Sequence, residues 1–187
     1  TNKDGDEFIA YTMIGAVQKN VGSVNEDFSF TNDIITNRII TVTKSGNNIS
    51  DYNDLSGKKL AVVTDIAKAA LDKNATIKNN NKNTLYPTIE DALSALDNGS
   101  VDAVITDEFN FSPLENAEKY QVLNGELDKI SYAFMFKKGD WVVENWNEAI
   151  YELKSPDYND KDEFTPMVEK YFGYNASSFD YVPSKTK

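Results

Sequence analysis

The chain contains no cysteine and no histidine. Without cysteine it has no disulfides, thiolate nucleophiles or cysteine-based metal sites, which fits a reducing compartment or a bacterial surface protein that does without disulfides. Without histidine it has no Ser-His-Asp chemistry and no imidazole ligand for a metal. Only carboxylates remain for acid–base catalysis, and no spacing pairs two of them for that work. The sequence therefore predicts no enzyme activity, no cofactor and no metal site.

Positive charge and long apolar runs are also scarce. The chain has 19 Lys and Arg residues against 30 Asp and Glu, a formal net charge of −11 and a pI of about 4.5. Such a surface repels phosphate backbones and acidic membranes, so we expect no nucleic-acid partner. No apolar run is long enough to span a membrane, and no signal peptide is visible. The polar opening segment is what we expect of a mature or trimmed chain.

The chain nevertheless has enough apolar residues to build a core. It has 187 residues, of which 40% are hydrophobic, and this length suits one large domain or two small lobes. The stretch between residues 88 and 97 predicts an amphipathic helix. Thr88 and Asp91 have the spacing of a capping pair, and Asn98-Gly99 is a typical helix stop. The apolar residues of this segment recur on one helical face: Ile89, Ala92, Leu93 and Leu96.

A buried strand is predicted directly after that helix. Val101, Ala103, Val104 and Ile105 form a nearly continuous apolar run, as in a strand covered on both faces. Asp107 stands where this strand should end. Because ligands of open parallel sheets bind beyond the carboxyl ends of the strands, Asp107 is the first candidate for a binding residue.

The remaining pattern is strand, helix, strand, helix, strand at close spacing, which is typical of βαβ units with a parallel sheet. Tryptophans 141 and 146 are expected in the core. We predict strands at Phe8–Met13, Phe28–Lys44, Lys59–Thr64, Leu85–Tyr86, Tyr120–Leu123 and Ile130–Lys137. Helices are predicted at Ile66–Lys73, Glu108–Lys119, Trp141–Leu153 and Pro166–Phe172, and the helix at Glu108–Lys119 is expected to break near Pro113. Residues Lys73–Asn83 are predicted to form a loop.

Several of these segments resemble the type 2 periplasmic substrate-binding proteins, and in particular the polar amino-acid receptors of ABC importers. The resemblance runs from about Phe28 to Gly173. It rests on DLSGKKLAVVT, an alanine-rich helix, TIEDALSALDNGSVDAVITD, ISYAFMFKKGD and the KYFG ending. Phe30-Thr31 takes the place of the Phe-Ser that precedes the family's second lobe. Family members carry several dozen more residues before the segment that matches Asp6.

The resemblance implies an α/β fold with two lobes, joined by two crossing strands near Ile34–Thr43 and Ile130–Phe136. Residues 1–43 and 130–187 would form a partial lobe one with the hinge strands, and residues 44–129 would form lobe two. Lobe one is expected to be incomplete. The ligand would lie in the cleft between the lobes, which close around it by a hinge motion, so the implied activity is capture rather than catalysis.

The resemblance also assigns candidate ligand-binding residues. Asp107 takes the place that receives the ligand's α-ammonium. It is equally expected to cap the next helix, and the two roles are compatible. Asp65 and Ile66 replace the family's Gly-Thr, and Asp65 is expected to cap a helix more readily than to bind ligand, since its carboxylate repels a ligand carboxylate. Thr12 is a candidate contact from lobe one or an ordinary strand residue.

Arginine occurs once in the chain, at position 38. The family's arginine, which clamps the ligand's α-carboxylate, belongs a few residues before Phe30, where Val24 or its neighbours stand. Arg38 is therefore expected to be a solvent-exposed or salt-bridged arginine, with a carboxylate clamp as the remote alternative.

Three functions remain open. The first is an extracellular solute-binding protein or receptor domain of an amino-acid ABC importer. It would be periplasmic or anchored by lipid to the cell surface, with an amino acid as ligand and the importer's permease as partner. The second is a domain of this fold that has lost small-molecule binding and serves in interaction or assembly, with a homodimer formed by strand exchange through the incomplete lobe. The third is the sensor domain of a membrane receptor.

Overall fold

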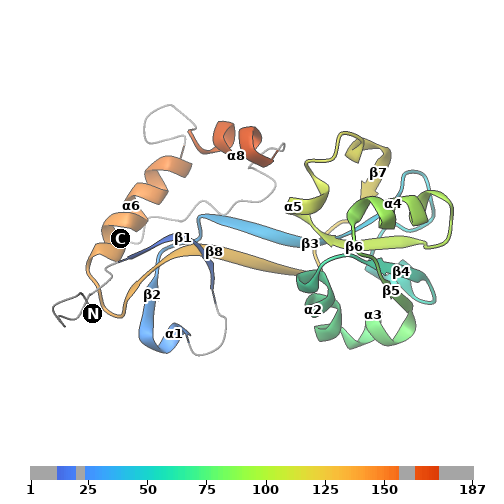
Figure 1. Ribbon diagram of the computed structural model, residues 1–187, viewed down its shortest axis with the longest axis horizontal. Helices are drawn as coiled ribbons and strands as arrows, with labels where there is room; N and C mark the ends of the chain where they lie inside the picture. Colours follow the sequence, from blue (N-terminus) through green and yellow to red (C-terminus); the bar gives the residue numbers. More distant parts are fainter. Residues whose placement is uncertain (1–11, 20–23, 156–162, 173–187) are drawn as a thin grey trace, which may run out of the picture. The chain divides into compact units, whose positions relative to one another are not determined.

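The computed structural model describes residues 12–19, 24–155 and 163–172. The chain divides into two compact units (Figure 1). Unit 1 comprises residues 1–36, 130–169 and 175–187, and unit 2 comprises residues 37–129 and 170–174. The chain passes between them within strand β3 (Ile35–Lys44) and again within strand β8 (Asp128–Lys137). Among the described helices, none is both long enough and apolar enough to cross a membrane.

Unit 2 is built on a mixed sheet whose centre is strand β6. Strand β4 lies between β6 and β5 and pairs with both in parallel, while β3 pairs antiparallel with β6 and with β7. All five residues of β6 are buried, so this strand is covered on both faces. The elements of this unit are β4 (Lys59–Val62), α2 (Asp65–Lys73), α3 (Ala75–Asn80), β5 (Lys82–Leu85), α4 (Ile89–Asp97), β6 (Ala103–Asp107), α5 (Glu108–Phe111), β7 (Tyr120–Val122) and the 3₁₀ turns η1 (Tyr52–Leu55) and η2 (Ala117–Lys119).

Helix α4 forms as its sequence predicts. The Thr88 hydroxyl accepts a hydrogen bond from the Asp91 backbone N–H at 3.1 Å, which caps the first turn. Gly99 follows the last turn with φ +77°, a backbone conformation that glycine adopts without strain. The apolar face packs on the sheet and shares one core cluster with Ile40, Ala61 and Val104. The predicted helix, stop and buried strand are therefore confirmed.

The predicted loop at Lys73–Asn83 is wrong, because this segment holds helix α3 and the start of β5. Asparagine side chains cap both ends of α3, although the polar composition of this segment is typical of a loop. Asn74 Oδ1 accepts from the Ile77 backbone N–H at 3.2 Å, and Asn81 Nδ2 donates to the Ile77 carbonyl at 2.6 Å. The single buried side chain of this helix, Ile77, ties it to the unit.

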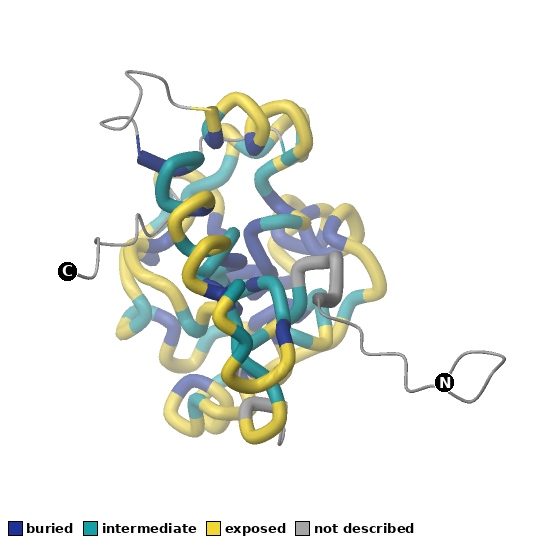
Figure 2. Tube along the Cα trace, turned by 90° about the vertical axis from the view of Figure 1, so that its left-hand side faces the viewer, coloured by how far each residue is buried: buried dark blue, intermediate teal, exposed yellow. Residues whose placement is uncertain are grey.

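Unit 1 centres on strand β8. Two antiparallel partners flank it: Thr12 of β1 pairs with Phe136, and Phe30 of β2 pairs with Met135. Helix α6 alternates between buried and exposed positions along its length (Figure 2). The elements are β1 (Thr12–Gln18), α1 (Val24–Asp27), β2 (Phe28–Phe30), α6 (Val142–Lys154) and α8 (Phe164–Phe172). Of the predicted strand Phe8–Met13, residues 8–11 lie outside the described residues.

Two further predictions about this part of the chain are wrong. The long strand expected over Phe28–Lys44 is divided into β2 and β3, since the Thr31 side chain bonds the backbone of Asn32 and Phe134 and so turns the chain. Trp141 is 74% exposed rather than in the core. Trp146 is exposed as well, with 36% of its surface accessible, although its ring packs on aromatic neighbours with its centroid 4.7 Å from that of Phe134.

The core beneath α4 gives a direct test of the fold of unit 2. Replacing Leu96 by Ala removes a fully buried side chain from the contact with the sheet, so we expect the free energy of unfolding to fall by about 2–5 kcal/mol. Ser94→Ala changes an exposed position of the same helix and should alter it by less than about 0.5 kcal/mol. Urea unfolding followed by circular dichroism measures both. Equal stability of the two variants would contradict the packing of α4.

Candidate functional site

The carboxyl ends of two neighbouring parallel strands of unit 2 bring three of the predicted site residues, with Glu108 next to them, to one edge of the sheet. Val62 of β4 pairs with Ile105 of β6, and the Val63 N–H donates to the Ile105 carbonyl at 3.1 Å. Each strand then runs directly into a helix, α2 after β4 and α5 after β6. The strand-to-helix steps carry Asp65, Ile66, Asp107 and Glu108. Ligands of open α/β sheets bind at such an edge.

Asp107 is the most buried member of this group, with 1% of its surface exposed. Its carboxylate caps helix α5, since Oδ1 accepts from the Asn110 backbone N–H at 3.2 Å. Oδ1 also accepts from Asn37 Nδ2 at 3.0 Å, and Oδ2 accepts from Asn110 Nδ2 at 2.8 Å. The capping role weighed for Asp107 is therefore observed, while the ligand-binding role stays a prediction.

Asn37, on strand β3, also holds this carboxylate. Its amide nitrogen donates to Asp107, and its Oδ1 accepts from the Phe109 backbone N–H at 3.2 Å. Both atoms of the buried amide are thus used in holding the turn between β6 and α5. A carboxylate in a fixed position, with an oxygen that can accept more than one hydrogen bond, can bind a donor such as an ammonium group.

Arg38 and Glu108 form a bidentate pair beside this turn. Arg38 Nε donates to Glu108 Oε2 at 2.8 Å, and Nη2 donates to Oε1. The hydrogen bonds that Arg38 donates to Glu108 raise the pKa of Arg38. Burial raises the pKa of Glu108 by more than the attraction of Arg38 lowers it, and the negative charge of Glu126 adds to the rise. The expectation of a salt-bridged arginine is confirmed, and the guanidinium edge used by Glu108 is not open to a ligand carboxylate.

The structure places the other predicted site residues differently. Thr64, not Asp65, caps helix α2, because its hydroxyl accepts from the Ala67 backbone N–H at 3.2 Å and the helix begins at Asp65. The capping prediction for Asp65 is therefore wrong, and its side chain is exposed. Ile66 is half-buried in the same turn. Thr12 lies in unit 1, where its backbone pairs with Phe136.

Asn37, Asn110 and Glu108 also belong to this edge, although the sequence did not predict them there. Asn110 follows Asp107 at the spacing of a helix cap, so the capping pattern could have indicated it. Asn37 and Glu108 carry no such local signal, because their partners are 70 residues away in the chain. Across the described ranges, no group of three or more acidic side chains could hold a metal ion.

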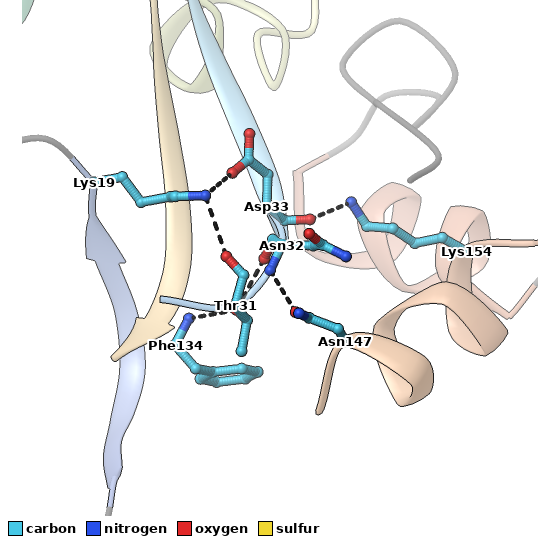
Figure 3. A network of polar contacts seen from close by, with 7 residues as sticks. All are labelled: Lys19, Thr31, Asn32, Asp33, Phe134, Asn147 and Lys154. Atoms are coloured by element: carbon cyan, nitrogen blue, oxygen red, sulfur yellow. Dashed lines mark hydrogen bonds and ion pairs between the residues drawn. The ribbon is translucent and has the colours of Figure 1, made fainter. Parts of the chain in front are cut away.

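Unit 1 has a separate polar network around the segment between β2 and β3 (Figure 3). Lys19 Nζ donates to the Asp33 carboxylate at 2.8 Å, and the buried Lys154 donates to the Asp33 carbonyl at 2.9 Å. Burial acts to raise the pKa of Asp33, but hydrogen bonds from Lys19 and Ser131 and the two lysine charges lower it overall. Asn147 Oδ1 accepts from the Asn32 N–H at 2.6 Å. This network fixes the segment that leads into β3.

Removing Arg38 tests the electrostatics of the unit 2 edge. In Arg38→Met the buried Glu108 keeps its carboxylate without the guanidinium. Because the Arg38 side chain is 28% exposed, we expect a loss of about 2 kcal/mol near neutral pH, less than for a fully buried pair. The folded-state pKa of Glu108 lies above its unfolded value. The ionised form therefore costs stability at high pH, and this cost vanishes as the pH falls below the unfolded value.

The loss caused by Arg38→Met should accordingly shrink when urea unfolding is repeated at about pH 4. The double variant Arg38→Met/Glu108→Gln should recover most of the lost stability at neutral pH, since it contains no unpaired buried charge. A loss that is the same at both pH values would show that packing of the Arg38 side chain, and not the charge of Glu108, is responsible.

No protein-family model and no curated protein sequence matches this chain. Solved structures do match it. One is a polar amino acid ABC uptake transporter substrate-binding protein from Streptococcus thermophilus, with 22% identity over 87% of this chain and 62% of that one, and a TM-score of 0.65. Another is the L-cystine solute receptor of Neisseria gonorrhoeae in its unliganded open conformation, with 18% identity over 89% and 69% of the two chains, and a TM-score of 0.70.

A third match is the GluR0 ligand-binding core from Nostoc punctiforme in complex with L-glutamate, with 21% identity over 88% of this chain and 74% of that one, and a TM-score of 0.55. The chain thus spans between 62% and 74% of the length of these three proteins. At this level of identity the similarity concerns the fold. Together with the two units and the two strands that run between them, it shows that this chain has the α/β fold of the type 2 periplasmic binding proteins.

Proposed function

We propose that this chain is the ligand-binding part of an extracellular solute-binding protein, or of a receptor domain, that serves an amino-acid ABC importer. Its ligand is a small polar molecule with an ammonium group, such as an amino acid, and its protein partner is the importer's permease. The observation that carries the proposal is the fixed carboxylate of Asp107 at the carboxyl edge of the parallel strands of unit 2. The fold shared with amino-acid-transporter proteins supports it.

The hydrogen bonds of Asp107 suggest how an ammonium group enters this site. Oδ1 is held by the buried Asn37 and by the backbone of α5, whereas Oδ2 bonds the side chain of Asn110. Asn110 is exposed, so its amide can rotate into solvent and leave Oδ2 to the ligand. A charged donor in place of a neutral amide roughly doubles the strength of the hydrogen bond. Asn110 would therefore act as a placeholder that the ligand displaces.

A second candidate function is an interaction, assembly or sensor domain that no longer binds small molecules. Two observations favour it: the Arg38 guanidinium is held by Glu108, and both oxygens of Asp107 already accept hydrogen bonds. In such a domain these groups would serve only the stability of unit 2. A homodimer belongs to this second candidate.

Ligand-induced stabilisation distinguishes the two. We expect at least one amino acid, or one of the amines left when the α-carboxylate is removed, to raise the melting temperature in a thermal-shift screen. Ligand at about 100 times its dissociation constant adds about 2.7 kcal/mol, or about 5–10 °C for a chain of this size. Isothermal titration calorimetry of the best compound should then give one binding site.

The variant Asp107→Asn should abolish this shift, since asparagine still caps α5 but has no charge for an ammonium group. Glu118→Gln removes one negative charge from an exposed position of η2 and should leave the shift unchanged. If no compound stabilises the wild-type chain, the second candidate is correct. If a compound stabilises Asp107→Asn as well as the wild type, the ligand does not bind through Asp107.

A further inference from the structure

Two Asn-Gly pairs occur in unit 2, Asn98-Gly99 and Asn124-Gly125. We propose that Asn124 is a site of spontaneous deamidation and isoaspartate formation in the native protein, and that the fold protects Asn98 from the same reaction. Because glycine has no side chain to hinder its backbone nitrogen, an Asn-Gly pair is the sequence in which this reaction is easiest. The inference goes beyond ligand binding and does not depend on it.

The reaction uses only groups of the pair and water. The backbone nitrogen of the glycine attacks Cγ of the asparagine and loses its proton, a new N–Cγ bond forms, and the Cγ–Nδ2 bond breaks with release of ammonia. Water then opens the resulting succinimide at one of its two carbonyls, which gives aspartate or isoaspartate. No oxidant, reductant or metal is needed. The rate depends on how freely the nitrogen and the side-chain carbonyl can approach each other.

Both reacting groups of the first pair are tied down. The Gly99 N–H donates to the Leu96 carbonyl at 3.2 Å, as part of the turn that ends α4. Asn98 Oδ1 accepts from the Ser100 backbone N–H at 2.9 Å and from the Ser100 hydroxyl. To reach Cγ the nitrogen must break the helix stop, and the side chain must rotate away from Ser100. Each step costs hydrogen bonds before the succinimide can form.

The second pair has no such restraint. Asn124 and Gly125 are exposed and lie in a bend between β7 and β8. In the part of the chain that the structure describes, neither the Asn124 side chain nor the Gly125 N–H has a hydrogen-bond partner. Gly125 has φ +87°, and a Cβ placed on it would meet only an atom of the Tyr52 ring, at 3.8 Å. The Gly125 nitrogen and the Asn124 side-chain carbonyl can therefore approach each other without breaking a hydrogen bond.

The products would alter a segment that is bonded to β3 on both sides of the pair. The Leu123 N–H donates to the Thr41 carbonyl at 2.9 Å, and the Leu127 N–H donates to the Ile39 carbonyl at 2.7 Å. Isoaspartate adds one methylene to the backbone between these two anchors. Both products also add a negative charge two residues before Glu126. We therefore expect isoaspartate, more than aspartate, to weaken the attachment of this segment to β3.

Timed incubation of the folded protein in mildly alkaline buffer at 37 °C, followed by peptide mapping with mass spectrometry and an isoaspartate assay, tests the proposal. We expect Asn124 to react at least about tenfold faster than Asn98, the factor that corresponds to one or two hydrogen bonds of the protected pair. In urea, where the fold is lost, the two rates should become similar. Equal rates in the folded protein, or a faster reaction at Asn98, would overturn the proposal.

Two variants separate the two halves of the proposal. Asn124→Gln should remove most of the isoaspartate formed by the native protein, and a level that does not change would show that the reaction occurs elsewhere. Ser100→Ala removes only the hydroxyl contact to Asn98, so any acceleration at Asn98 should stay well below that seen in urea. If Asn98 in Ser100→Ala reacts as fast as in urea, the backbone bond of Gly99 gives no protection and that half of the proposal is wrong.

Discussion

The complete burial of strand β6 is the constraint on which unit 2 depends. Water cannot reach the end of a strand whose five residues are all buried, so its polar groups need partners within the protein. In the described part of the chain the Thr106 hydroxyl of this strand has none, but the charged Asp107 does. The chain meets this demand by ending the strand on Asp107, whose carboxylate starts helix α5 and accepts the amide of Asn37. The same arrangement that stabilises the strand end also fixes a negative charge at the carboxyl edge of the sheet.

The charges at this edge are organised unequally. The guanidinium of Arg38 is neutralised by Glu108. Burial disfavours the ionised form of Glu108 and raises its pKa. Asp107, in contrast, is stabilised by neutral amides and by the start of a helix, and its hydrogen-bond partners within the described residues include no cation. A site of this kind attracts a cation more readily than an anion. This asymmetry is why the proposed ligand is defined by its ammonium group rather than by a carboxylate.

The sequence predicted those parts of the fold whose signals are local. Helix α4 and strand β6 follow from a capping threonine, a 3.6-residue period, a glycine stop and an apolar run, all within 20 residues of one another. The same rules failed at residues 73–83, where asparagines cap helix α3 with their side chains and so look like a loop by composition. They also failed at Thr31, whose contact with Phe134 interrupts a pattern that reads as one long strand.

The candidate site was predictable only in part, for the same reason. The position of Asp107 follows from its place after a buried strand, but its partner Asn37 lies 70 residues earlier in the chain. Lys154 and Asp33 of unit 1 are separated by 121 residues, so no spacing rule brings them together. Burial of a lysine is also the opposite of what composition suggests. Such pairs are set by the register of strands, which only the assembled sheet determines.

Strand β3 enters unit 2 directly at the two residues that hold the carboxyl edge of the sheet. The boundary falls between Thr36 and Asn37, so the first two residues of unit 2 on this strand are the ones that hold Asp107 and Glu108. A substitution at Asn37 or Arg38 therefore acts at once on the first residues of unit 2 in β3 and on the turn between β6 and α5.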